Sequence, residues 1–512
     1  MRFSAAIPTD KILFGASAAP GRIQEGHELI WAVVDRLDGR AYGEMSEDGV
    51  RLLYAKPRII VDLDADEEYE EKAAQWWELF LDLMYVAAAS NLADALKDEL
   101  DREGALAYVL MFSIFFNGWL FYTLHQTRFV ANSMFHLGLF YVFMLGTALM
   151  VVNCSAFEFA HGFSAACIIQ RVALLLLYAD TYAHVPRARM ALTIWIQIIS
   201  VAVVGFILAL VLDSAKAYKL IWTGTVLLDA YFHLHHHLFR MPEEHRVPLN
   251  IDHCAERFSC MLLVILGESI VSCVINYRDL PQDARSYTYY AVMALTLLMV
   301  FALALIYYML LPPRAIHAMR RSVVTGSAFV LMHQIMLCAL LGMGVGVKFV
   351  MIAVTDDAID VLTIPEMLLL FVCLSIAMLS FFVIRLLHFW GRQPTPKDEP
   401  KVRKLKYAWW ALVGVWWLIP LIFAVAGAML KHQMKLRIEP FPCMLLACGT
   451  IFIYSFLETI LAHVLVHVSE DGLGMNSQHG AIQFKRSIRA STDQDQLCPA
   501  SYGSFPPTQS DS

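Results

Sequence analysis

The chain has 512 residues, of which 58% are hydrophobic and only 17% are charged, and its formal net charge is -7. A soluble domain usually has about 45–50% apolar and about 25% charged residues. The composition therefore excludes an ordinary soluble protein and indicates an integral membrane protein. The ten cysteines show no paired metal or redox spacing, and the absence of a basic stripe predicts no nucleic-acid partner.

The first 75 residues are polar and mixed, with an acidic run at 62–71 shortly before Trp76 and Trp77. They contain too few apolar residues to bury a large core. We therefore expect a cytosolic N-terminal arm over residues 1–75. The membrane region should begin at the tryptophan pair, because tryptophan is enriched at the membrane interface.

Apolar segments of about 20 residues, the length needed to cross a bilayer, recur twelve times after the arm. They cover 76–96, 106–124, 133–153, 163–179, 190–212, 217–239, 254–275, 289–311, 322–346, 364–390, 407–430 and 440–468. The first and sixth segments carry several charges or histidines, so the prediction is an all-α polytopic transmembrane helix bundle of about 10–12 spans.

The connections between these segments predict the orientation. Lys and Arg are more frequent in the connections that would be inside if the N-terminus is cytosolic, and positive charge favours the cytosolic side. With an even number of spans, both termini are then cytosolic, although the sequence does not say in which membrane. The tail over 469–512 lacks apolar periodicity and is expected to be disordered.

Two apolar stretches contain charged residues, which are costly in hydrocarbon and therefore usually paired and functional. In the first, Glu78 and Asp82 are four residues apart and share one helix face. In the second, Glu256 and Arg257 precede Glu268, which lies about 18 Å beyond Glu256 along a helix at about 1.5 Å per residue. One glutamate should therefore lie near a surface and the other well inside.

Together the two stretches resemble the signature of the bacterial low-temperature-requirement A family, which reads ELFFDLVFV and HLAERFGLFVIIALGES. Here they read ELFLDLMYV from Glu78 and HCAERFSCMLLVILGES from His253, so the charged positions and Gly267 are kept. Weaker matches are Arg171, Asp229 and His333. The resemblance implies a multi-pass membrane protein whose biochemical activity is poorly defined, and it supplies no reaction.

Short matches also suggest an internal repeat. Residues 78–80 match 256–258, and further matches follow in order at an offset that only grows along the chain, as loop insertions would produce. We predict two parallel six-helix halves, 76–253 and 254–468, related by an axis along the membrane normal. Glu78 and Glu256 would then lie at equal depth on either side of that axis, and a substrate path would run between the halves.

The leading hypothesis is a transporter or channel for a proton, an ion or a small solute. Buried acids beside arginines can exchange protons, so the candidate path residues are those charged side chains, with Glu256 and Glu268 at the centre: Glu78, Asp82, Arg171, Asp229, Glu256, Arg257 and Glu268. The alternative is a structural ion-pair network that holds the helices in register, and the two interpretations are compatible.

A group of histidines suggests a second class of function, a metal-dependent enzyme. Asp229, His233, His236 and His237 share nearly one helix face, a geometry that suits zinc and an intramembrane metal-dependent lipid hydrolase. The alternative is a polar helix end that reaches toward water. Otherwise we expect no cofactor, and we favour transport over catalysis. His253 and His333 are candidates for pH sensing.

A third hypothesis is a membrane scaffold or sensor without transport. The expected partners are the lipid bilayer and a small ion or solute, and a homo-oligomer stays open. The sequence names neither the substrate nor the direction of movement.

Overall fold

The computed structural model describes most of the chain between residues 53 and 468. The described residues are 53–60, 75–155, 157–238, 245, 247–274, 287–312, 316–355, 361–389, 393–396, 398–434 and 437–468, without the side chains of 232–238, 310 and 466. The predicted tail and nearly all of the predicted arm lie outside them, so both remain predictions.

The chain divides into two compact units, residues 1–56 with 131–138, and residues 57–130 with 139–512. In the described part of the first unit, the backbone N–H of Phe135 donates to the Leu53 carbonyl at 3.0 Å. The Tyr54 ring contacts the Phe135 ring edge-on, with 5.7 Å between the ring centroids. The second unit contains the candidate site.

Helices make up almost the whole described chain. They are α2 (Trp76–Asp98), α3 (Arg102–Gln126), α4 (Met134–Val152), α5 (Ala160–His184), η2 (Pro186–Ala188), α6 (Arg189–Leu212), α7 (Ala215–Leu238), α8 (Ile251–Val274), α9 (Tyr287–Leu310), α10 (Ala318–Arg321), α11 (Val323–Thr355), α12 (Ile364–Phe389), α13 (Pro400–Val415), α14 (Leu418–Met434) and α15 (Pro440–Val468). Among the described residues, the sheet structure is one antiparallel pair, β1 (Arg58–Ile59) with β2 (Phe129–Val130).

Eleven of the described helical segments are long and apolar enough to cross a membrane. Helices α13 and α14 count as a single segment, Pro400–Met434. The predicted sixth span, 217–239, corresponds to α7, which is helical but does not reach that apolar criterion within the described residues. The number lies in the predicted range, and the prediction of an all-α polytopic bundle is confirmed.

Local polar contacts mark where helices begin and end. The Asp101 side chain accepts the Gly104 backbone N–H at 2.8 Å and caps the start of α3. At the start of α2, Glu78 accepts the Gln75 backbone N–H at 2.8 Å. Asp213 ends α6 with a left-handed backbone, φ 38°, which short polar residues tolerate best after glycine.

Burial separates central from lipid-facing helices. Nearly all side chains of α3 between Leu110 and Gln126 are buried, so this helix lies inside the bundle. Helix α6 instead exposes large apolar side chains, among them Val204 at 63% and Val211 at 75%. Exposed valines of this kind suit a helix whose outer face meets hydrocarbon instead of water.

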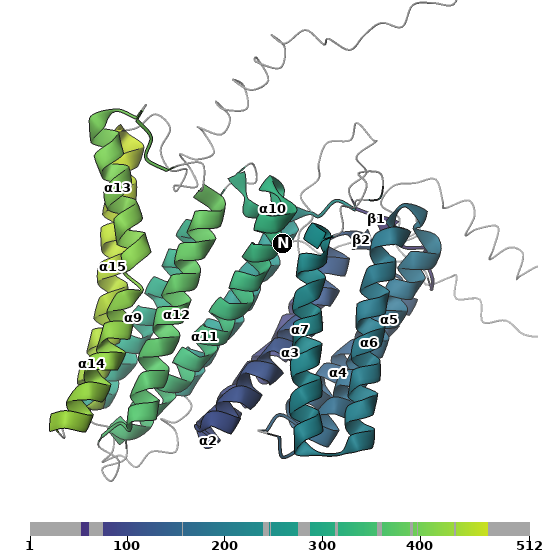
Figure 1. Cartoon of the computed structure of the whole chain (residues 1–512), viewed down its shortest axis with the longest axis horizontal. Helices are drawn as coiled ribbons and strands as arrows, with labels where there is room; N and C mark the ends of the chain where they lie inside the picture. The colour runs from purple at the N-terminus through teal and green to yellow at the C-terminus, as the bar shows by residue number, and fades with distance from the viewer. Residues whose placement is uncertain are drawn as a thin grey trace, which may run out of the picture. The chain divides into compact units, whose positions relative to one another are not determined.

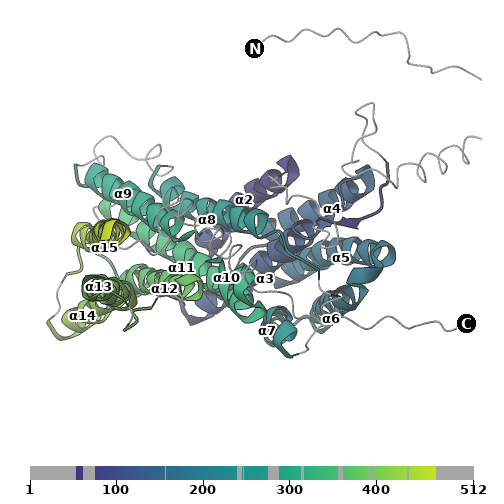
Figure 2. The ribbon, with the colours of Figure 1, turned by 90° about the horizontal axis from the view of Figure 1, so that it is seen from above.

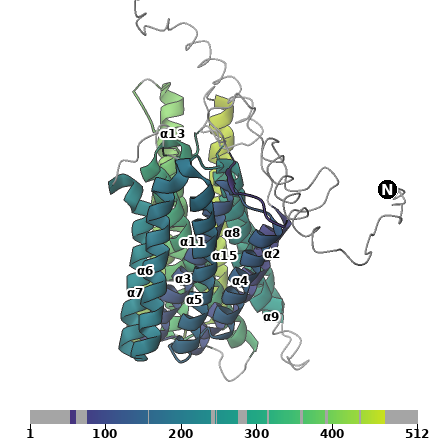
Figure 3. The same cartoon turned by 90° about the vertical axis from the view of Figure 1, so that its right-hand side faces the viewer.

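The long helices run side by side along one common direction (Figures 1 and 3). Seen from above, α4, α5 and α6 lie on the right and α9 and α12–α15 on the left, with α2, α3, α7, α8 and α11 between them (Figure 2). Following the predicted halves, we call α2–α7 the first group of six. Helices α8, α9, α11, α12, α13 with α14, and α15 form the other.

Part of the packing order is the same in both groups. In each, the first helix packs on the second, the second on the sixth, the fourth on the fifth, and the fifth on the sixth. Between the groups, α2 packs directly on α8. This shared order favours the predicted six-helix repeat, which itself stays a prediction.

Candidate functional site

The candidate site lies where α2 and α8, the first helices of the two groups, pack on each other. We call this contact the seam. Glu78 and Asp82 of α2 meet His253 and Arg257 of α8, while further along both helices Ser90 and Asp94 lie near Glu268. Residue numbers thus rise together on the two helices, so α2 and α8 are parallel along the seam.

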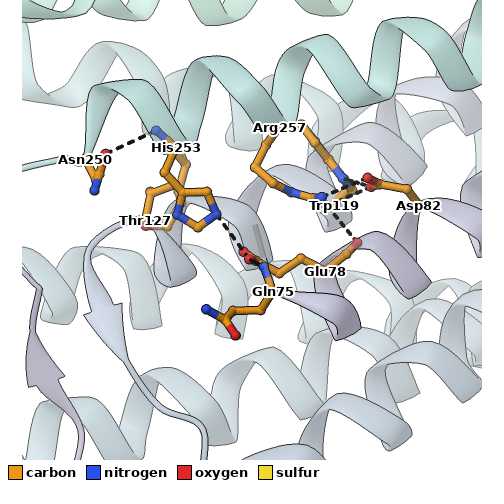
Figure 4. Close-up of polar contacts among 9 residues, drawn as sticks. Gln75, Glu78, Asp82, Trp119, Thr127, Asn250, His253 and Arg257 are labelled. Atoms are coloured by element: carbon orange, nitrogen blue, oxygen red, sulfur yellow. Dashed lines mark hydrogen bonds and ion pairs between the residues drawn. The ribbon is translucent and has the colours of Figure 1, made fainter. Parts of the chain in front are cut away.

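One end of the seam holds a fully buried charge network, the seam cluster, drawn in Figure 4. Arg257 donates through NH1 and NH2 to both carboxylate oxygens of Asp82, at 2.8 and 2.7 Å. NH2 also donates to the Glu78 backbone carbonyl at 2.9 Å. A two-point contact of this kind is the strongest geometry for a guanidinium and a carboxylate.

Neighbouring polar groups complete the seam cluster. The Trp119 indole N–H donates to Asp82 at 3.2 Å, and His253 Nε2 lies 3.1 Å from Glu78 Oε2. Asn250 accepts the His253 backbone N–H at 3.1 Å and so caps α8. The acids therefore come from α2 and their partners, His253 and Arg257, from α8.

Glu268 lies toward the other end of the seam. Its side chain is 3% exposed, one oxygen lies 3.4 Å from the Ser272 hydroxyl, and Oε2 has no hydrogen-bond partner among the described residues. The nearest cation, Lys348, instead contacts Asp94. Glu268 is thus a buried acid without a bonded counter-charge in the described structure.

A small apolar pocket separates the two polar ends. Side chains of α2, α3, α8 and α11 line it, and they are Tyr85, Ala88, Ala89, Leu92, Phe112, Phe115, Phe116, Met261, Ile265 and Leu341. The seam therefore alternates between charged, apolar and charged.

Two further ion pairs lie inside the two groups, one in each. Arg171 on α5 contacts Asp229 on α7 at 2.7 Å, with both side chains buried. Arg385 on α12 contacts Glu458 on α15 at 2.6 Å, also buried. We call these the two inner pairs. Sequence reasoning missed Arg385 and Glu458 as site residues, although each is a single charge within an apolar stretch.

The structure does not bring Glu256 into any of these clusters. Glu256 is exposed, whereas its neighbour Arg257 is buried, because adjacent residues on a helix point about 100° apart. Glu78 is only 1% exposed. Glu256 therefore differs from Glu78 in burial, and it does not lie inside the seam, where we expected the centre of the path; whether the two lie at equal depth stays a prediction.

The histidine predictions have different outcomes. His333 is buried with both ring nitrogens engaged, Nδ1 by the Phe329 carbonyl at 2.8 Å and Nε2 by the Tyr307 hydroxyl at 3.1 Å, which is typical of a structural histidine. The side chains of His233, His236 and His237 lie outside the described ones. No group of three or more potential metal ligands occurs among the residues that were described, so the zinc hypothesis stays untested.

Comparison with known proteins gives the family. Neither the curated proteins nor the solved structures contain a match to this chain. The model of the family described as bacterial low temperature requirement A protein (LtrA) matches residues 73–468, which include the seam cluster, Glu268 and both inner pairs. This match confirms the resemblance that the two motifs suggested. The chain belongs to the LtrA family of multi-pass membrane proteins.

Proposed function

We propose that this protein is a transporter or channel for a proton, an ion or a small solute, and that its path follows the seam between α2 and α8. The observation that carries the proposal is the buried acid Glu268, which has an oxygen without a hydrogen-bond partner in the described structure. It lies on the same helix as the charged seam cluster, with a small apolar pocket between them.

A purely structural network accounts for only part of this arrangement. In the seam cluster, Asp82 is neutralised by Arg257, and Glu78 contacts His253, so those pairs can hold the two helices in register. Glu268 holds no such partner in the described structure. A carboxyl group that is buried without a bonded cation takes up a proton or a cation more readily than a paired one, which suits a step along a path.

The pairs between the two helix groups are also compatible with movement of one group relative to the other. Each pair joins an acid of the first six helices to an arginine or a histidine of the second six. Relative movement of the two groups would separate these partners, whereas contacts within a group would persist. The apolar pocket would act as the barrier between the polar ends, because it offers few polar atoms to a passing ion.

Proton flux into proteoliposomes tests the proposal. Vesicles loaded with a pH dye receive a proton gradient under a potassium and valinomycin clamp, with empty vesicles as the baseline. We expect flux with the wild type and loss of most of it with Glu268→Gln, which removes the titratable group at nearly constant volume. Glu256→Gln is the matched control, since it changes an exposed glutamate on the same helix and should leave flux intact.

Unchanged flux with Glu268→Gln in a well-folded protein would refute the role of this acid. Equal loss with both variants would point to a general effect of charge on α8 instead of a path along the seam. Flux in no sample would refute proton transport, and uptake of other ions and solutes would then be measured.

We further propose that both termini lie in the cytosol. The support is the greater frequency of Lys and Arg in the connections on that side, together with α7 as a twelfth crossing. Labelling of single cysteines placed in the arm and in the tail, with a reagent that does not cross membranes, tests this. Labelling of one terminus only in intact cells would contradict it.

A further inference from the structure

The two inner pairs share an unusual pattern of hydrogen bonding. In each, a single guanidinium nitrogen, NH2, contacts the carboxylate, of Asp229 in one case and Glu458 in the other. The Nε and NH1 atoms of both arginines find no partner among the described residues. Three of the five N–H donors of each guanidinium are therefore uncommitted in a buried position.

Arg257 in the seam cluster behaves differently. Its NH1 and NH2 atoms both bond Asp82, and NH2 also bonds a backbone carbonyl, so only Nε lacks a partner in the described structure. Unpaired buried N–H groups are costly, about 1–3 kcal/mol each. Arg171 and Arg385 thus each leave two guanidinium nitrogens without a partner in the described structure, whereas Arg257 leaves one.

The inner pairs also occupy corresponding places. Each joins the fourth helix of its group to the sixth, α5 to α7 and α12 to α15. An aromatic ring lies near each guanidinium, Phe121 at 5.1 Å from Arg171 and Tyr454 at 5.7 Å from Arg385. Two copies of one unusual arrangement favour a shared role over two independent packing defects.

We propose that each inner pair is a binding site for one small monovalent anion, which enters together with a proton. This inference rests on the proposed transport function and names a substrate class for it. The uncommitted N–H groups of Arg171 and Arg385 donate to the anion. The proton binds a carboxylate oxygen of Asp229 or Glu458. The proton comes from hydronium in the surrounding water, so one O–H bond of hydronium breaks as the carboxylic O–H bond forms, and no other covalent bond changes.

Charge balance is the reason for coupling the two ions. Each empty pair is neutral, with one guanidinium and one carboxylate. An anion alone would leave a net negative charge in a low-dielectric interior, which is costly. When the carboxylate takes up a proton, the guanidinium and the anion form a neutral pair in its place. The loaded site is then neutral as well, so transport should carry no net charge.

Anion replacement in the proteoliposomes tests this coupling. Chloride, nitrate and methanesulfonate serve as small monovalent anions, and gluconate serves as a much larger anion for comparison. We expect proton uptake that is at least tenfold faster with a small anion than with gluconate, and that does not change when the potassium and valinomycin clamp is set to different voltages.

The possible failures are distinguishable. Proton flux that is the same in all anions, or that follows the clamped voltage, would overturn the coupled anion while leaving the proposed transport function intact. Absence of proton flux in every anion would overturn the coupled anion and proton transport together.

Arginine variants locate the anion. Arg171→Lys and Arg385→Lys keep a cation beside the acid but remove the guanidinium donors, so each should raise the anion concentration needed for half-maximal flux about tenfold. Arg189→Lys, at an exposed arginine on α6, is the matched control and should behave as the wild type. An unchanged anion dependence in both inner variants would overturn the assignment.

Binding is also measurable without transport and without variants. In detergent at constant ionic strength, replacing gluconate by chloride or nitrate should raise the thermal unfolding temperature of the wild-type protein, and more at pH 5 than at pH 8, because binding takes up a proton. The same temperature in all anions at both pH values would overturn the proposal.

Two further variants, Asp229→Glu and Glu458→Asp, exchange the two acids and should keep the anion effect.

Discussion

The seam cluster and the two inner pairs all bury an arginine beside an acid, but the hydrogen bonds of the arginine differ. Arg257 donates hydrogen bonds from two nitrogens to Asp82, across the contact between the helix groups. Arg171 and Arg385 each donate from one nitrogen to an acid of their own group. A two-point contact is strong and geometrically specific. The comparison teaches that burial of an ion pair does not by itself assign its role, because the hydrogen bonds left over differ.

The largest expected effect comes from breaking the seam cluster. Arg257→Gln leaves Asp82 buried without its cation, which typically costs about 3–5 kcal/mol. Thermal unfolding followed with a thiol-reactive dye measures this, since the nine described cysteines are free and buried or half-buried. The double variant Asp82→Asn with Arg257→Gln should lose less than the sum of the single losses. Additive losses would contradict a direct pair.

Lysine substitution sharpens the comparison between the three arginines. Arg257→Lys loses the two-point contact and should cost about 2–3 kcal/mol, since hydrogen bonds to charged groups contribute about 1.5–3 kcal/mol each. Arg171→Lys and Arg385→Lys give up no second contact and should each cost about 1 kcal/mol. The same dye assay ranks them. Equal losses at all three positions would remove the distinction between seam and inner pairs.

Glycine substitutions compare the two helix groups directly. A Cβ at Gly146 on α4 would lie 2.6 Å from the Gln170 backbone nitrogen, and one at Gly346 on α11 would lie 2.7 Å from Leu370 Cα. Both sites bring the third helix of a group against the fourth. Gly146→Ala and Gly346→Ala should each destabilise the protein by about 1–3 kcal/mol through overpacking.

Gly267→Ala is the control for these two variants, because a methyl group added at this position on α8 would meet no other atom within 4 Å. Its unfolding temperature should match that of the wild type. A loss at Gly146 without a loss at Gly346 would argue against equivalent packing in the two groups.

The smallest expected effect concerns His317, a buried histidine that stays neutral in the folded protein. His317, in the connection before α10, is 2% exposed, and burial lowers its pKa to about 3. The unfolded chain, with a histidine pKa of about 6.5, therefore binds a proton that the folded protein does not. Stability should fall as the pH decreases below about 6.5, by about 1 kcal/mol between pH 7 and pH 5.5.

His317→Gln removes the titrating group and should flatten this pH dependence in the dye assay. His388, whose ring lies 4.6 Å from that of His317, remains in the variant. A pH dependence as steep as that of the wild type would show that other groups cause it.

The burial of most charged residues in the site could be predicted from the sequence. Glu78, Asp82, Arg257 and Glu268 were expected to be buried because charges in apolar stretches need a protected environment, and all four are. One of Glu256 and Glu268 was expected near a surface and the other well inside, and Glu256 is the exposed one; only its expected place at the centre of the path was wrong. Its distance from Arg257 is one residue, and no local pattern specifies which of the two is buried.

The sequence also did not predict which charged residues form ion pairs with each other. Arg171 was considered a counter-charge for the acids as a set, and the structure gives it to Asp229. Glu458 was not a candidate, although it pairs with Arg385. Such contacts join residues 58 and 73 positions apart, so they depend on which helices become neighbours.

The sequence by itself determined that this chain is a helical membrane protein of the LtrA type and that its few intramembrane charges are protected. Both follow from local chemistry, because hydrocarbon requires apolar segments whose backbone bonds itself. Only the tertiary structure decided that α2 and α8 form a seam, that Glu268 lacks a bonded cation in the described chain, and that two arginines keep spare donors. Those features depend on how each helix is rotated and on what packs against it, which hydropathy does not encode.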